Sequence, residues 1–367
     1  MRISRLPYRW LAAGYLMAGM ALAQNAPLHR LVLEPGVLSR SVHLADFNGD
    51  GRLDVAVLNG SETGPGSLAV MLRNRGGYTA PIVTPTGGFG SWSMAVADFN
   101  GDGKMDAAVT NNRTGNVTIL LGRGNGTFRA AGFFSTHVGP TAIQAADFNH
   151  DGRLDLAVVN SGSGDVTILL GKGDGTFTTG ASVYLGSSPT DVAVADFNGD
   201  GIPDLAVTNG AMFLQVAVVL LGNGDGTFHI GQSATTGTEP FALVAGAFSR
   251  FGRSDLAIAN LASNDISVLA GNGDGTFQPA AAYAAGNGPA AIAAADFNRD
   301  GVPDLAVCND MSGDVSIYLG NGDGTFRPAR GFATGGSPTS IAVGDLNGDG
   351  RMDVATAGPD GVILLFP

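Results

Sequence analysis

Short apolar runs alternate with polar turns along almost the whole chain. In one stretch, the runs 192–195 and 205–207 lie on either side of a loop rich in Asp, Asn and Gly. A third run of the same kind, 166–170, follows a polar turn. These runs are rich in Val and Ile and are bounded by Gly, Asn, Asp and Pro. This pattern predicts short β-strands rather than helices.

One polar motif, Asp-x-Asn-x-Asp-Gly-x-x-Asp, recurs about every 50 residues. Complete copies begin at positions 46, 98, 147, 196, 296 and 345, and a degraded copy beginning at Ala247 keeps only Gly252 and Asp255. Each of the seven units has room for four short strands. The repeat therefore predicts an all-β fold, a seven-bladed β-propeller of four-stranded antiparallel blades.

The two ends of the chain complement each other. The last unit stops at 362–366, after its third strand, while the apolar segment 28–34 precedes the first loop and has no other partner. We predict that the N-terminal strand completes the last blade as its outer strand. This pairing closes the ring and leaves few edges exposed. An open solenoid with frayed ends is the alternative.

Residues 1–23 have the pattern of a secretory signal peptide. Arg2, Arg5 and Arg9 precede the apolar stretch 11–20, and Ala-Leu-Ala at 21–23 is a small-x-small cleavage pattern. The apolar stretch is shorter than the roughly 20 residues of a membrane span, and no later segment predicts a transmembrane helix. We therefore expect a secreted protein that is extracellular, held at the cell surface or periplasmic. Its propeller occupies 24–367, with hairpin loops beginning near 46, 98, 147, 196, 247, 296 and 345.

Acidic residues outnumber basic ones by 32 to 20, and all but three of the acidic residues are Asp. Helix surfaces would favour Glu, so the excess of Asp indicates turns or metal loops. The chain has no cluster of basic residues, which argues against nucleic-acid binding because phosphate contacts need Lys and Arg. The single cysteine, Cys308, excludes an intramolecular disulfide and is expected to be buried and inert.

The repeated loops have the pattern of calcium sites. Ca²⁺ takes about six to eight oxygen ligands, and side chains at positions 1, 3, 5 and 9 of a tight loop can converge, with a backbone carbonyl at position 7. We predict about six structural Ca²⁺ ions. The predicted ligands are Asp46, Asn48, Asp50, Asp54, Asp98, Asn100, Asp102, Asp106, Asp147, Asn149, Asp151, Asp155, Asp196, Asn198, Asp200, Asp204, Asp296, Asn298, Asp300, Asp304, Asp345, Asn347, Asp349 and Asp353.

Two other interpretations of these loops fit the sequence less well. An EF-hand needs a Glu at position 12, but position 12 is Val or Thr here. Ordinary hairpin turns also favour Asp, Asn and Gly, yet they do not require three carboxylates that repel one another. In the fifth unit, Ala247, Ser249 and Phe251 replace three ligands. We expect a hairpin without metal there, with Phe251 packed locally.

The acidic loop, the later Gly-x-Gly-Asp-Gly-Thr-Phe motif and a Gly/Pro segment recur together. This combination resembles the FG-GAP (VCBS-like) repeat family, which includes the calcium-binding propeller of integrin α chains. The resemblance covers about residues 28–367. It implies calcium in the loop between the first two strands of each blade, and a role in adhesion or ligand binding. The first unit departs from the second motif, and the fifth unit departs from the first motif.

No catalytic constellation is visible in the sequence. It contains no His-Glu-x-x-His and no Gly-x-Ser-x-Gly, and its five His residues show no ligand spacing. We therefore predict a protein that is not an enzyme. The minor alternative is a polysaccharide-degrading enzyme that uses the loop carboxylates.

The loops after the first and third strands share one regular face, and the opposite face is irregular. Irregular loops on a rigid scaffold usually carry specificity. The candidate ligand-binding residues on that face are Trp92, Arg113, Phe213 and Phe241; alternatively, Trp92 and Phe241 fill the central channel. The expected function is a secreted calcium-binding module for an extracellular protein or glycan partner. A calcium-dependent, lectin-like sugar binder is the alternative.

Overall fold

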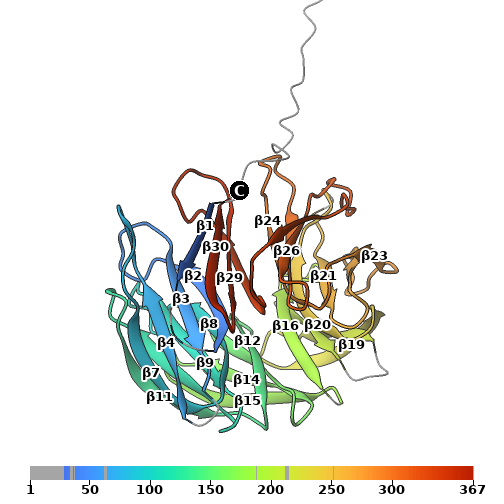
Figure 1. Cartoon of the computed structure of the whole chain (residues 1–367). Helices are drawn as coiled ribbons and strands as arrows, with labels where there is room; N and C mark the ends of the chain where they lie inside the picture. The colour runs from blue at the N-terminus through green and yellow to red at the C-terminus, as the bar shows by residue number, and fades with distance from the viewer. Residues whose placement is uncertain are drawn as a thin grey trace, which may run out of the picture.

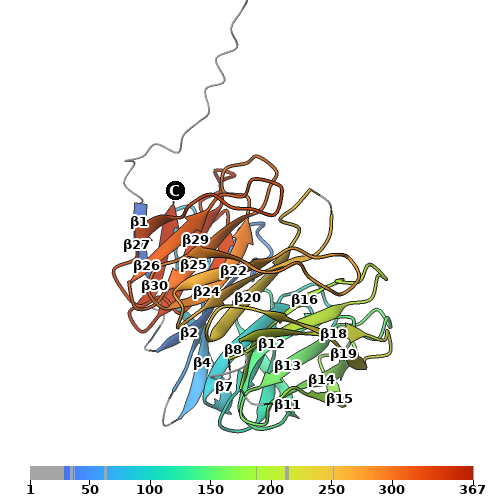
Figure 2. The same cartoon turned by 90° about the vertical axis from the view of Figure 1, so that its right-hand side faces the viewer.

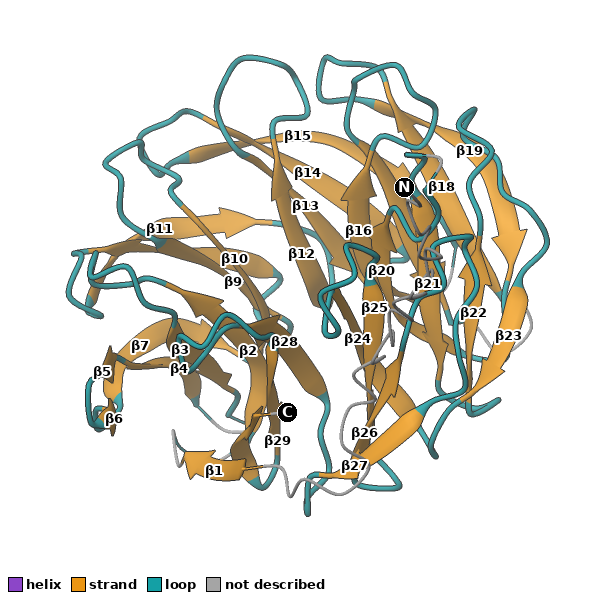
Figure 3. Ribbon diagram, turned by 90° about the horizontal axis from the view of Figure 1, so that it is seen from above, coloured by secondary structure: helices purple, strands orange, loops and turns teal. Residues whose placement is uncertain are grey.

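A computed structural model describes residues 29–33, 36, 38–61, 64–186, 188–210, 215–250 and 252–366. These residues form seven four-stranded antiparallel sheets arranged in a ring around a central axis (Figures 1 and 3). The predicted seven-bladed propeller is confirmed. The described residues contain no helix, and hence none with the length and apolar character of a membrane span. The predicted signal peptide at 1–23 lies outside the described residues.

The blades are numbered here in chain order, from the inner strand to the outer strand. Blade one consists of β2 (Ser39–Ala45), β3 (Asp54–Asn59), β4 (Pro65–Met71) and β7 (Ile82–Phe89). Blade two consists of β8 (Ser91–Ala97), β9 (Asp106–Asn111), β10 (Asn116–Gly122) and β11 (Phe128–Ser135). Blade three consists of β12 (Pro140–Ala146), β13 (Asp155–Asn160), β14 (Asp165–Gly171) and β15 (Phe177–Tyr184). Blade four consists of β16 (Pro189–Ala195), β17 (Asp204–Asn209), β18 (Val216–Gly222) and β19 (Phe228–Thr235). Blade five consists of β20 (Pro240–Gly246), β21 (Asp255–Asn260), β22 (Asp265–Leu269) and β23 (Ala281–Ala284). Blade six consists of β24 (Pro289–Ala295), β25 (Asp304–Asn309), β26 (Asp314–Tyr318) and β27 (Arg330–Ala333). Blade seven consists of β28 (Ser340–Gly344), β29 (Asp353–Gly358), β30 (Gly361–Phe366) and β1 (His29–Leu33).

The N-terminal strand closes the ring. Strand β1 pairs antiparallel with β30, with Leu31 opposite Leu364, and the two strands lie side by side in both side views (Figures 1 and 2). The inner strands contact one another in blade order, and β28 of blade seven contacts β2 of blade one. The predicted closure by the N-terminal strand is therefore confirmed, and the open solenoid is excluded.

The hydrophobic core is divided into layers between neighbouring blades. The second strand of every blade is buried along its whole length, as in β17, because another blade covers each of its faces. Each core cluster joins two blades; one of them packs Phe148 and Ile168 of blade three against Leu205 and Val207 of blade four. A strand buried on both faces needs apolar residues at consecutive positions, which explains runs without polar alternation.

Two parts of the ring depart from the regular blade. In blade one, a small hairpin of β5 (Arg73–Asn74) and β6 (Gly77–Tyr78) follows the third strand in place of the Gly-rich turn. In blades five and six, the outer strands have four residues, compared with eight in blades two to four. A proline follows shortly after the Thr-Phe pair in both short cases, at 279 and 328. Proline lacks the N–H that a strand ladder needs, so pairing is interrupted there.

Candidate metal loops

The acidic loops connect the first and second strands of their blades, as the sequence predicts. In the first loop, Asp46 and Asn48 are half-buried, Asp50 is exposed, and Asp54 at the start of β3 is fully buried. The other five complete loops repeat this gradient. The loop therefore has an accessible half, formed by motif positions 1, 3 and 5, and a buried half, formed by position 9.

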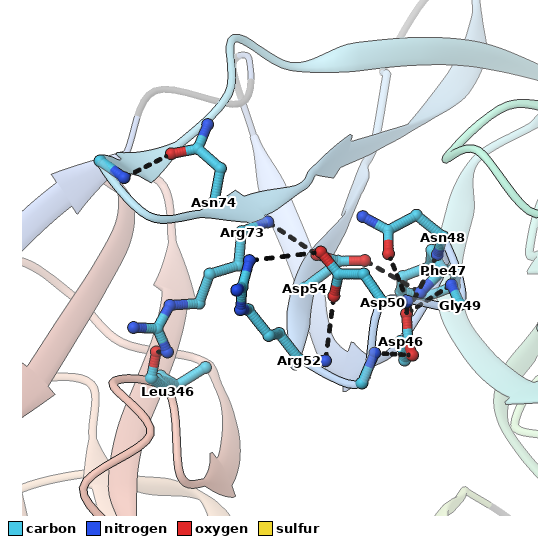
Figure 4. Close-up of polar contacts among 12 residues, drawn as sticks. Asp46, Phe47, Asn48, Gly49, Asp50, Arg52, Asp54, Arg73, Asn74 and Leu346 are labelled. Atoms are coloured by element: carbon cyan, nitrogen blue, oxygen red, sulfur yellow. Dashed lines mark hydrogen bonds and ion pairs between the residues drawn. The ribbon is translucent and has the colours of Figure 1, made fainter.

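The carboxylate at position 1 organises the accessible half. Asp46 Oδ1 accepts the N–H of Gly49 at 2.7 Å and that of Asp50 at 3.1 Å, while Oδ2 accepts the N–H of Gly51 at 2.7 Å (Figure 4). Gly51 has a φ of 79°, so the sharp turn uses the left-handed region that glycine adopts readily. Desolvation alone would raise the pKa of Asp46, but the backbone donors together lower it. Asp46 is therefore held as an anion at the centre of the loop.

The carboxylate at position 9 clamps the buried half. Asp54 Oδ2 accepts the N–H of Phe47 at 2.9 Å, and Oδ1 accepts the N–H of Arg73 from the end of the third strand at 2.6 Å (Figure 4). The same two bonds recur in four other complete loops, at Asp106, Asp155, Asp204 and Asp304. Position 9 thus ties the loop, the second strand and the end of the third strand together.

Burial makes the position-9 carboxylates costly to ionise. Desolvation raises the pKa of Asp155 to about 6, and repulsion from Asp151 and Asp147 acts in the same direction. The pKa of Asp353 is also raised to about 6 for the same reasons, with Asp349 and Asp345 as the repelling groups. Three carboxylates of one loop therefore interact unfavourably, and a bound cation would relieve that repulsion.

The loop residues fit Ca²⁺ by their chemistry. The donors are carboxylate and amide oxygens, the type that Ca²⁺ prefers. Each carboxylate oxygen has two lone pairs, so one backbone bond leaves acceptor capacity at position 9. In the seventh loop, Asp353 Oδ1 is buried and has no hydrogen-bond partner among the described residues. Across those residues, however, no three Asp, Glu, His or Cys side chains converge as a ready-made metal site. In the first loop, the carboxylates at positions 1 and 9 instead accept backbone N–H groups.

The degraded fifth loop keeps the clamp without the accessible acidic residues. Asp255 Oδ2 accepts the N–H groups of Phe248 and Ser249 at 3.0 and 3.1 Å, and Oδ1 accepts the N–H of Gly271 at 2.7 Å. Ala247 and Ser249 stand where complete loops have Asp and Asn. Phe251, predicted to pack locally, lies outside the described residues. Sequence reasoning assigned position 9 only as a metal ligand and missed its role as a backbone clamp.

Five of the seven loops between first and second strands are also attached to the next blade. The carbonyl oxygen of Phe47 at position 2 accepts the N–H of Gly126 in the turn of blade two at 3.2 Å, and its ring meets Phe128 edge to face at 5.9 Å. The same pair of contacts joins blades two to three, three to four, four to five and five to six. The recurrence of Phe in both motifs of nearly every unit was the signal for this contact.

A side chain replaces this attachment where the ring closes. Blade one lacks the Gly-rich turn, and the Arg73 guanidinium instead donates to the carbonyl oxygens of Leu346 and Asn347 in the seventh loop, the latter at 2.9 Å (Figure 4). Arg73 therefore joins blade one to the loop of blade seven beside the strand that closes the ring.

The candidate ligand-binding residues that the structure describes are divided between blades two and five. Trp92 on β8 is 38% exposed, and the Arg40 guanidinium carbon of blade one lies 4.6 Å from its ring centroid. Arg113, in the turn after β9, donates its backbone N–H to Phe89. Phe241 on β20 is half-buried against the core shared by blades five and six. Phe213 lies outside the described residues. Blades two and five are not neighbours, so Trp92 and Phe241 belong to separate parts of the ring.

Cys308 is buried, as predicted. Its side chain has no exposed surface, and desolvation raises the pKa of the thiol above its ordinary value. A neutral, inaccessible thiol is a poor nucleophile.

Comparison with known families places the repeats in a defined group. A family model described as "FG-GAP-like repeat" matches residues 46–109, 98–158, 147–207, 252–307 and 303–356, and a model described as "FG-GAP repeat" matches 188–227. Together the matches cover well over half of the chain. A search of curated proteins found no match.

Several solved structures share the fold at low sequence identity. BBS1N, from a crystal structure in complex with ARL6DN, is 14% identical with a TM-score of 0.64 over 92% of this chain and 96% of that chain. A protein of unknown function from Desulfotomaculum acetoxidans DSM 771 is 13% identical with a TM-score of 0.60, over 80% and 86% of the two chains. A candidate 6-phosphogluconolactonase from Bacteroides uniformis ATCC 8492 is 14% identical with a TM-score of 0.63, over 84% and 88%. These similarities support the propeller architecture alone.

Proposed function

Because this chain belongs to the FG-GAP repeat family, we propose that it is a secreted, calcium-stabilised propeller that binds an extracellular protein or glycan and performs no catalysis. The observation that carries the proposal is the sixfold repetition of one oxygen-rich loop beside a buried carboxylate of position 9. Secretion is supported by the signal-like pattern of residues 1–23.

In this proposal, the side-chain oxygens at positions 1, 3 and 5, the carbonyl at position 7 and the remaining lone pairs at position 9 hold each Ca²⁺. The ion supplies positive charge that offsets the repulsion of three carboxylates in one loop. Because position 2 of most loops is bonded to the next blade, ordering a loop also strengthens a junction of the ring. The metal would thus stabilise a chain that has no disulfide.

Binding of a macromolecular partner is supported by the scaffold and by one similarly folded protein. A closed ring holds its loops rigidly, and its irregular face exposes Trp92 beside Arg40. BBS1N, which shares the fold, was crystallised in complex with another protein, ARL6DN. A rigid ring that displays variable loops is suited to recognition, and no chemistry beyond binding is needed to account for these features.

Isothermal titration of the secreted protein with Ca²⁺ tests the metal part. We expect about six ions per chain, and a chain that takes up no Ca²⁺ at millimolar concentration contradicts the proposal.

Arrays of extracellular glycans and surface proteins, screened with and without Ca²⁺, test the binding part, with Trp92→Ala as a matched variant. Binding of glycans only, and only with Ca²⁺, would favour the lectin-like alternative. Turnover of a polysaccharide panel would favour an enzyme.

A further inference from the structure

A groove of about 480 Å³ runs along the flank of the ring between blades four and five. Strand β19 forms one wall, and β22, β23 and the segment 277–280 form the other, at the rim of the ring seen from above (Figure 3). The volume lies within the range of small-molecule sites, roughly 300–1,000 Å³. Among the described residues, none from the acidic loops and none of the candidate ligand-binding residues lines this groove.

The groove opens because a large side chain is missing at this junction. On the outer strand, the position that faces the next blade is Phe134 in blade two and Tyr283 in blade five, and both pack edge to face on a neighbouring Phe. In blade four, the same position in the strand register is Ala234. An alanine cannot fill the space that an aromatic ring of blade two or blade five occupies at its own junction.

Pro279 widens the same gap. The ladder between β22 and β23 runs only to the pair Val268–Ala281 and resumes at the isolated pair Gly271–Phe277. In blade four, Ile230 stands where blade five has Pro279, and its backbone pairs with Leu220. Proline has no N–H to donate, so the outer strand leaves the ladder, and Leu269 and Pro279 line the groove.

Asp265 lines the groove and has one carboxylate oxygen without a partner among the described residues. Its Oδ1 accepts hydrogen bonds from Asn260 Nδ2 and Ser263 Oγ, both at 2.8 Å. Its Oδ2 has no hydrogen-bond or ion-pair partner among the described residues, and Asp265 lines the groove.

The junction between blades two and three shows which group pairs with the equivalent carboxylate oxygen there. In blade three, Asp165 Oδ1 accepts the equivalent bonds from Asn160 and Ser163, and Oδ2 is paired with the His137 imidazole, which reaches over from blade two. In blade four, Gly237 stands at the position of His137, three residues before the proline that begins the next blade. The groove between blades four and five is therefore open at the point that the His137 imidazole occupies between blades two and three.

From these contacts we propose that the groove binds a small cationic amine that carries hydroxyl groups, an amino sugar. The ammonium pairs with Asp265 Oδ2, as His137 pairs with Asp165. Gln232 and Gln278 offer hydrogen bonds to hydroxyls, and Phe277 and Leu269 provide an apolar wall. A charge-assisted bond in a half-buried position is stronger than a neutral one. This inference does not rest on the proposed calcium function.

The test uses glucosamine as the probe, titrated into the full secreted protein and followed by saturation-transfer NMR and calorimetry. We expect binding that falls at least tenfold when N-acetylglucosamine, which carries no charge, replaces glucosamine. Equal binding of the two sugars, or no glucosamine binding at millimolar concentration, would overturn the proposal.

Two variants locate the binding in the groove. Asp265→Asn keeps the Oδ1 acceptor and removes the charge, so glucosamine affinity should fall at least tenfold, while the matched Asp165→Asn should leave it unchanged. Ala234→Phe, which reproduces the aromatic residue of blade two, should fill the groove and abolish binding while the melting temperature stays the same or rises. If Ala234→Phe still binds glucosamine, the ligand does not occupy this groove. Because Ca²⁺ uptake is measured separately, failure here is distinct from failure of the metal loops.

Discussion

The loops of blades four and five are adjacent in the ring and differ in one respect. The loop of blade four has Asp196, Asn198 and Asp200 in its accessible half, and blade five has Ala247 and Ser249 at the first two of these positions. Both loops keep a buried Asp at position 9 with the same backbone partners. The comparison indicates that position 9 is enough to hold the hairpin, and that the backbone bonds made by the acidic accessible half are not required for it.

Removing metal should separate the two kinds of loop most strongly. A site with a dissociation constant of about 10⁻⁴ M contributes about 1.4 kcal/mol at millimolar Ca²⁺, so six sites contribute up to about 8 kcal/mol. We expect EDTA to lower the melting temperature by about 10 °C or more. Hydrogen exchange should accelerate in six loops and stay the same in the fifth. An unchanged melting curve would leave the accessible acidic residues without a structural role.

Substitution of the position-9 carboxylate should lower the stability of the protein by the same amount with and without metal. Asp255→Ala removes the acceptor of three N–H bonds at a buried position, and we expect a loss of about 4 kcal/mol, since each unsatisfied buried donor costs about 1–3 kcal/mol. Urea unfolding should give the same loss with and without EDTA. The control, Asp200→Ala in the accessible half of loop four, should destabilise the protein only when Ca²⁺ is present. A loss at Asp255 that vanishes in EDTA would contradict the clamp.

The same two blades also meet at the central channel, through a carboxylate. Asp191 on β16 accepts the N–H of Leu243 on β20 at 3.1 Å, and desolvation raises its pKa to about 6. Because the folded pKa lies above the unfolded value of about 3.9, this group's favourable contribution is fully present below pH 4 and is lost as pH rises through 6. Asp191→Asn should therefore gain roughly 2 kcal/mol over the native protein at pH 7 and little at pH 4. Urea midpoints across this range measure the difference; a gain independent of pH would show that Asp191 does not titrate this way.

A smaller effect is expected at the start of blade five. Asn260 Oδ1 is buried and has no partner among the described residues, and Pro240 lies opposite it in the strand register. In blades one and two, a serine at that position donates its hydroxyl to the Asn, as Ser91 does to Asn111 at 3.1 Å. Pro240→Ser should stabilise the protein by about 1 kcal/mol, measured by thermal unfolding. The control Pro240→Ala offers no hydroxyl, and equal stability of the two variants would argue against the unsatisfied oxygen.

Much of the fold could be predicted because its determinants are local. The strands follow from short β-branched runs, and the turns follow from Gly, Asn and Asp at fixed places. The period shows how many blades are present, and the unmatched segments at 28–34 and 362–366 show where the ring closes. The positions of the six acidic loops followed from the same repeat. Their metal content remains a prediction.

Other features depend on residues that meet only after the blades pack. Position 9 was predicted as a ligand, but its hydrogen bonds to Phe and Gly backbones appear only when the third strand returns beside the loop. Arg73 and Leu346 are far apart in the sequence and meet because the ring closes.

The sequence by itself determined the propeller, its closure and the places of its acidic loops, since each depends on spacing within one unit. Only the tertiary structure decided the backbone clamp at position 9, the attachment of most loops to the next blade and the groove beside Asp265. Those features arise between blades, where the space left by Ala234 and the oxygen left unpaired by Gly237 depend on how two neighbouring sheets pack.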